Sequence, residues 1–197
     1  MTDTVDDIYF KELAEKDSRD VCGRVPCRYD DKKKCYVISA WGDDYEIFPH
    51  ERRMRLLDNT AQKPDSLFCL FIIYYLLRSM GIKAIGQWIS EKDLPGGPTF
   101  FRGPHEVPTR LISQRFGNDI DGFRDRCLVL HGTPLDMGDA AYRFDILPEI
   151  PVAVLYWAGD DEFPSEAKVL YDKGLSGQFP LDIVFSLAVA ICSRIAF

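Results

Sequence analysis

The segment from Gly96 to His105, "GGPTFFRGPH", holds the side chains best suited to bind a small ligand. Its glycines allow the backbone to approach a ligand closely, and Phe100 and Phe101 offer apolar faces. Arg102 presents a planar donor fork that suits a carboxylate or phosphate, and His105 can coordinate a metal or transfer a proton. Long loops without helix or strand are often functional, so we expect residues 93–108 to form a ligand-binding loop.

A purely structural interpretation of the same loop stays open. The two phenylalanines could simply pin it to the core, with Arg102 salt-bridged to the acidic run at Asp160, Asp161 and Glu162. No GxxxxGK[ST] or GxGxxG motif occurs in the sequence, so a nucleotide-phosphate cradle is not supported.

A second candidate is the acidic run Asp160, Asp161 and Glu162, which directly follows the apolar stretch "IPVAVLYW". Crowded carboxylates repel one another and need cations, hydrogen-bond donors or solvent. They could form a metal site, a catalytic carboxylate pair, or a solvated corner between two strands. A Ca²⁺ or Mg²⁺ site would need further oxygens at set spacing, and Glu166 and Asp172 supply them only loosely. We therefore expect a structural corner, with metal or catalytic roles as alternatives.

The cysteines do not predict a cluster. Cys22, Cys27, Cys35 and Cys69 are spaced unlike the usual zinc or iron–sulfur frames, which favour two-residue gaps. Cys27 and Cys35 fall on facing strands of a predicted hairpin, where they could simply be a cross-strand pair.

Composition limits the partners and the compartment. The formal net charge of -7 argues against sequence-independent nucleic-acid binding, because few cations could replace phosphate counterions.

The N-terminus is acidic where a signal peptide needs basic and apolar residues, so we expect a cytoplasmic protein. Residues 67–77 are apolar but far shorter than the ~20 residues that span a bilayer. Residues 179–197 are apolar but carry Asp182 and Arg194. We expect both segments to be core helices, with no membrane partner.

The elements that would position these residues follow from local patterns. We expect an amphipathic helix over 4–16 with Val5, Ile8, Tyr9 and Leu13 on one side, a β-meander over 24–49, and an apolar helix from Asp65 or Ser66 to Gly81. Residues 82–90 should be extended, and Arg52 to Arg55 should lie on a solvated helix face. Further expected elements are helices at 107–116 and 118–130, strands at 151–157 and 167–172, and a last helix from Pro180. Residues 1–197 are expected to form a single α+β domain, in which a small antiparallel meander and a mixed sheet pack with buried helices.

Four segments carry a family resemblance. These are "GQWISEKDLPGG", "GD" at Gly138 and Asp139, "ILPEIPVAVLYWAGDDEFPSEAKVLYD" and "FPLDIVFSLA". In this order they resemble the family called domain of unknown function 3786, which is seen mostly in anaerobic bacteria and archaea. The resemblance implies no settled activity. The family's occurrence in anaerobes and its occasional fusion to an iron–sulfur module imply a role near cobalt, nickel or iron cofactors.

The leading hypothesis is an accessory protein that binds a small, anionic, partly apolar cofactor in anaerobic metabolism. A haem or corrinoid is the concrete version, with Phe100, Phe101, Arg102 and His105 as one wall and with Trp88 and Trp157 as weaker candidates. Two alternatives remain open. One is an enzyme that uses the acidic run, and the other is a protein–protein adaptor for a metalloenzyme.

Overall fold

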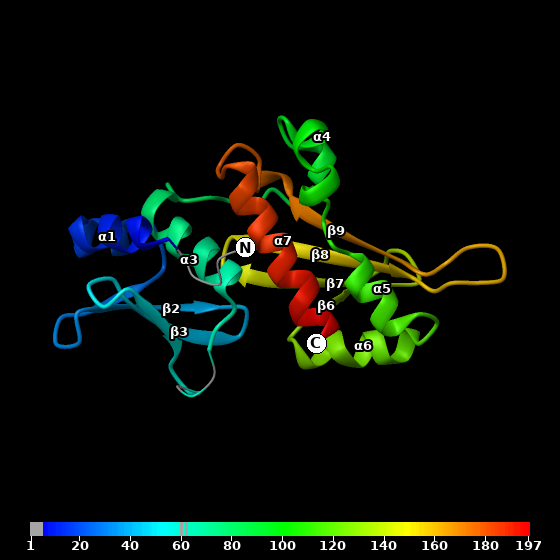
Figure 1. The fold of residues 1–197 in the computed structure, drawn as a ribbon, viewed down its shortest axis with the longest axis horizontal. Helices are drawn as coiled ribbons and strands as arrows, with labels where there is room; N and C mark the ends of the chain where they lie inside the picture. Colours follow the sequence, from blue (N-terminus) through cyan, green and yellow to red (C-terminus); the bar gives the residue numbers. More distant parts are fainter. Residues whose placement is uncertain (1–5, 60, 62) are drawn as a thin grey trace. The chain divides into compact units, whose positions relative to one another are not determined.

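The computed structural model describes residues 6–59, 61 and 63–197, and the chain divides into two compact units, Met1–Ile82 and Lys83–Phe197. Figure 1 labels their helices and strands. Each unit combines helices with an antiparallel sheet, which confirms the α+β class. The single domain over 1–197 stays a prediction, and each unit is described by itself.

An aspartate caps the beginning of each helix described in the first unit. The helices are α1 (Asp7–Glu15), α2 (Ser18–Arg24) and α3 (Ser66–Arg78). Asp6, Asp17 and Asp65 each accept a hydrogen bond from a backbone N–H two or three residues further on, at 2.8–3.0 Å. These bonds satisfy N–H groups that the first helical turn leaves without a partner. The predicted cap at Asp65 is confirmed.

The buried face of α1 differs from the expected one. Phe10 and Leu13 are buried, whereas Ile8 is 61% exposed. Val5, which we expected on the same face, lies outside the described residues. The expected helix over 4–16 corresponds to α1. A separate helix, α2, follows it and was not predicted from the sequence.

The sheet of the first unit is a meander in the order β1-β2-β3-β4. Its strands are β1 (Arg28–Asp30), β2 (Cys35–Ala40), β3 (Asp43–Phe48) and β4 (Arg53–Leu56). β4 corrects the expectation of a helix face at Arg52 to Arg55. Its strand pairing places Arg55 opposite Glu46, a 1% exposed carboxylate that needs a cation.

The second unit is built on a sheet in the order β5-β9-β8-β7-β6. Its strands are β5 (Trp88–Ile89), β6 (Thr133–Leu135), β7 (Ala140–Leu147), β8 (Ile150–Trp157) and β9 (Glu166–Asp172). All pairs of these strands are antiparallel, so the expected mixed sheet is wrong. The cause lies in the connections: residues 136–139, 148–149 and 158–165 make hairpins, whereas parallel neighbours need a long crossover.

Helices cover one face of this sheet. They are α5 (Arg110–Phe116), α6 (Ile120–Val129) and α7 (Leu181–Ala196), and Figure 1 shows α7 crossing the strands. The ring of Phe123 on α6 stacks on Tyr156 of β8 with 4.6 Å between centroids. The other face carries Ala141, Ala153, Leu155 and Leu170, which form a separate buried cluster.

The two apolar segments are core helices, as expected. Most side chains of α3 are buried, and α7 begins after Pro180 and buries ten residues. Among the described residues, no helix combines the length and the apolar character needed to cross a bilayer.

Candidate functional site

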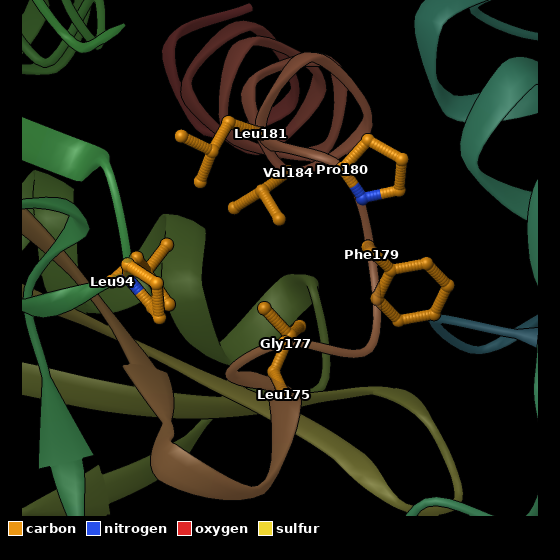
Figure 2. Close-up of a pocket in the computed structure, with 8 residues that line it drawn as sticks. Leu94, Leu175, Gly177, Phe179, Pro180, Leu181 and Val184 are labelled. Carbon is orange, nitrogen blue, oxygen red and sulfur yellow. The ribbon is translucent and has the colours of Figure 1, made fainter. Parts of the chain in front are cut away.

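An apolar cavity of about 190 Å³ opens at the beginning of α7. Three segments of the second unit surround it, and Figure 2 shows their side chains facing a common space. The lining residues are Leu94, Pro95, Leu175, Gly177, Phe179, Pro180, Leu181 and Val184. No charged side chain is among them, so the cavity itself suits an apolar group.

The wall at Leu94 is held by tight turns. Ser90 caps η1 (Glu91–Asp93), and its N–H and hydroxyl both donate to the Asp93 carboxylate, at 2.8 and 2.7 Å. α4 (Gly97–Phe100) follows. A Cβ atom at Gly97 would lie 2.0 Å from the carbonyl oxygen of Glu91, so no larger residue fits there without movement of the backbone. The expected loop over 93–108 therefore contains short helical turns, including η2 (Gly103–His105).

The wall at Leu175 is held by the buried carboxylate of Asp172, which the sequence suggested only as a loosely placed metal ligand. Asp172 is 2% exposed and accepts hydrogen bonds from the N–H groups of Ile85, Gly86 and Gly174, at 2.8, 2.6 and 2.8 Å. These bonds fix η3 (Lys173–Leu175), which supplies Leu175 to the cavity. The available signal was an Asp followed by Lys-Gly directly after a strand, a pattern typical of an Asp-capped turn.

An aromatic cluster lies beside the cavity. The His105 ring stacks on Phe100, with centroids 4.6 Å apart and an interplanar angle of 23°. Phe185 forms a T-shaped pair with His105, with ring centroids 5.5 Å apart and an interplanar angle of 86°. Phe185 lies one helical turn after Leu181, so one side of α7 contributes to both the cavity and the cluster.

The structure therefore brings together part of the predicted wall. Phe100 contacts His105 and also Phe101, whose ring centroid lies 5.1 Å away. Phe101 is buried in the core, while Arg102 and His105 are exposed. Arg102 makes no ion pair with the described part of the chain. The salt bridge to the acidic run, which the purely structural interpretation of the loop required, is therefore absent there.

Trp88 and Trp157 lie elsewhere. Both pack against the cluster of Ala153 and its neighbours on the sheet face away from the helices. The sheet separates them from α7 and its cavity, so they form a patch of their own and do not extend the wall at Phe100.

The acidic run is a turn between β8 and β9, and Figure 1 shows this hairpin projecting from the sheet. The Asp160 carboxylate accepts hydrogen bonds from the N–H groups of Phe163 and Glu162, at 2.7 and 2.8 Å, and these two bonds lower its pKa. Asp161 and Glu162 are exposed. Across residues 6–59, 61 and 63–197, no group of three or more His, Cys, Asp or Glu side chains is placed to hold a metal ion.

The cysteine pairing differs from the expected one. Strand register places Cys35 opposite Asp30, and Cys27 precedes β1, so the predicted Cys27–Cys35 pair is wrong. Cys27 instead lies against Cys22, because α2 extends to Arg24 where a strand was expected.

Comparison with known proteins gives one match. The family described as Domain of unknown function (DUF3786) matches residues 17–194. No curated protein and no solved structure matches the chain.

Proposed function

This chain belongs to the family described as Domain of unknown function (DUF3786), and we propose that it is a non-catalytic accessory protein that binds a small, partly apolar anion. The observation that carries the proposal is the apolar cavity at the start of α7, enclosed by two turns that are fixed by buried or capping aspartates. Preformed apolar hollows of this kind are the usual form of small-molecule sites.

The cavity limits the ligand's size. Pockets for drug-sized ligands measure about 300–1,000 Å³, whereas this cavity measures about 190 Å³. It accommodates one compact apolar group, such as a branched aliphatic chain or a single aromatic ring. A haem or corrinoid ring would have to lie outside it, so the tetrapyrrole version loses support relative to a smaller ligand.

Arg102 is the residue we assign to the ligand's anionic end. It follows the two phenylalanines of the wall, it is exposed, and it makes no ion pair with a described residue. A charge-assisted hydrogen bond contributes about 1.5–3 kcal/mol. Replacing Arg102 by alanine should therefore weaken binding about ten- to a hundredfold.

Calorimetric titration tests the proposal. The probes are branched-chain and aryl carboxylates, with haem and cobalamin titrated in parallel. Leu181→Trp fills the cavity and should abolish carboxylate binding. Val189→Trp changes another half-buried position on α7 that does not line the cavity, and it should leave binding intact. The proposal fails if the wild type binds none of the probes, or if Leu181→Trp binds as well as Val189→Trp.

A protein–protein adaptor is the second candidate, favoured by an apolar patch. Leu128 and Val129 at the end of α6 are 52% and 69% exposed, and Phe197 is 84% exposed. Arg126 donates hydrogen bonds to the carbonyls of Arg194 and Ile195, which brings the ends of α6 and α7 together.

A double substitution discriminates the two candidates. Leu128→Lys with Val129→Lys should release a co-purifying partner if the chain is an adaptor, while carboxylate binding stays unchanged. The carboxylates of the acidic run give less support to an enzyme, because Asp160 is engaged in its own turn.

A further inference from the structure

Cys22 and Cys27 stand apart from the other cysteines. Their sulfurs are 3.4 Å apart, with the Cys27 thiol donating to Cys22 Sγ. Both side chains are half-buried, so reagents can reach them, whereas the remaining cysteines are buried: Cys35, Cys69, Cys127 and Cys192.

We propose that Cys22 and Cys27 are a reversible dithiol–disulfide pair that reacts with low-molecular-weight disulfides. The pair lies in the first unit, so this inference is independent of the cavity proposed as the ligand site.

The surrounding structure holds the two thiols in place. Arg24, between them in sequence, donates hydrogen bonds to the carbonyls of Ser79 and Leu76, at 2.5 and 3.1 Å, which fix the end of α2. Cys27 is fixed from the other side, because its N–H donates to Val25 O at 2.8 Å and β1 begins at the next residue. A disulfide needs sulfurs about 2.0 Å apart, so a small movement of the two side chains closes the pair.

The chemistry is two successive thiol–disulfide exchanges. Cys22 loses its proton and attacks one sulfur of the disulfide RSSR, forming Cys22–S–SR and releasing RS⁻, which takes up a proton. Cys27 then loses its proton and attacks Cys22 Sγ, and the second RS⁻ leaves and is protonated. The two cysteines lose two electrons and two protons in total, and RSSR becomes two RSH.

The order of attack follows from the hydrogen bond and from burial. Cys22 accepts the Cys27 S–H, a contact that a thiolate at Cys22 would strengthen. Burial, and then the contact with Cys22, raises the pKa of the Cys27 thiol. Cys22 is therefore the first nucleophile of the pair, and Cys27 attacks second.

Disulfide mapping tests the pair on the full chain. The reduced protein is incubated with oxidised glutathione, quenched with N-ethylmaleimide under denaturing conditions and digested with trypsin. Trypsin cleaves after Arg24, so the disulfide would join peptide 20–24 to peptide 25–28. We expect this linked pair to form, to disappear with dithiothreitol, and to leave the four buried cysteines alkylated.

Single variants give the controls. In Cys27→Ser, glutathione should remain attached to Cys22, and it should attach there faster than to Cys27 in Cys22→Ser. Cys35→Ser should still form the linked pair. The proposal is overturned if the wild type, still folded by circular dichroism, forms no such link, or if links between other cysteines form equally.

Discussion

The imidazole of His105 lies nearly flat on the ring of Phe100, with 4.6 Å between their centroids. Phe185 of α7 adds a T-shaped contact with the same imidazole. The histidine ring thus joins the segment containing α4 and η2 to α7 through aromatic contacts, although the residue remains exposed.

We therefore expect His105→Ala to loosen residues 97–105 and His105→Phe to preserve them. An aromatic pair contributes about 0.5–1.5 kcal/mol beyond its buried area. Hydrogen exchange of residues 97–105 measures the effect, and protection should fall about two- to tenfold in the alanine variant alone. Equal loss in both variants would instead assign a role to the imidazole nitrogens.

Removing the hydroxyl from two buried tyrosines should change the stability of the protein in opposite directions. Tyr171 Oη is buried and has no hydrogen-bond partner among the described residues, while Tyr156 Oη donates to Gly117 O at 2.5 Å. An unsatisfied buried polar group costs about 1–3 kcal/mol. Tyr171→Phe should therefore stabilise the protein by about 1 kcal/mol, and Tyr156→Phe should destabilise it by about as much.

Urea unfolding of the two variants measures this difference. Destabilisation by Tyr171→Phe would mean that its hydroxyl has a partner, such as an internal water. The phenol pKa of Tyr171 is raised well above its ordinary value, by burial first, which agrees with an isolated hydroxyl.

The meander, the cap at Asp65 and the start of α7 after Pro180 could be predicted because each depends on neighbouring residues. Turn residues, capping side chains and apolar runs act over a few positions. The strand β4 could not be predicted in this way. Its basic residues acquire their role only through pairing with β3, where Glu46 is buried.

The candidate site shows the same limit. Phe100 and His105 were predicted from local composition, and they do meet. The cavity beside them combines residues 94–95 with residues 175–180 and the first turn of α7. The first segment lies about 80 residues before the other two, and the segments share no motif. Apolar residues such as Leu175 and Val184 look like ordinary core positions in the sequence.

Glu46 should make the stability of the protein depend on pH. Burial raises the pKa of this carboxyl, but the hydrogen bonds from Lys33 Nζ and Arg55 Nε, each at 2.7 Å, outweigh it, so the net shift is downward. A carboxyl with a lowered folded pKa stabilises the protein above its unfolded pKa of about 4.3. This stabilisation is lost as the pH falls through the folded pKa.

We therefore expect Glu46→Gln to lower the free energy of unfolding by about 1–3 kcal/mol at pH 7. The difference from the wild type should shrink below about pH 4. Glu51→Gln is the control, because Glu51 forms an exposed pair with Arg53 and should change stability by less than about 0.5 kcal/mol. A difference that stays constant from pH 7 to pH 3 would show that Glu46 is not ionised in the folded protein.

Two glycine-to-alanine substitutions test the turn that forms one wall of the cavity. At Gly97 a Cβ atom would lie 2.0 Å from Glu91 O, a backbone atom, whereas at Gly23 in α2 nothing lies within 4 Å. Gly97→Ala should destabilise the protein by about 1–3 kcal/mol, because backbone must move to relieve the overlap. Gly23→Ala should stabilise it by about 0.5–1 kcal/mol, since alanine favours a helix interior over glycine.

The two variants should also differ in ligand binding. Movement of Glu91 in Gly97→Ala shifts the neighbouring Leu94 and Pro95, which line the cavity, so affinity for the carboxylate probes should fall. Gly23 lies in the other unit, and its variant should bind as the wild type does. Urea unfolding and calorimetric titration measure the two effects separately. A Gly97→Ala protein as stable as the wild type would show that the close approach to Glu91 does not exist. If it were destabilised yet bound the probes normally, the wall at Leu94 would not belong to the binding site.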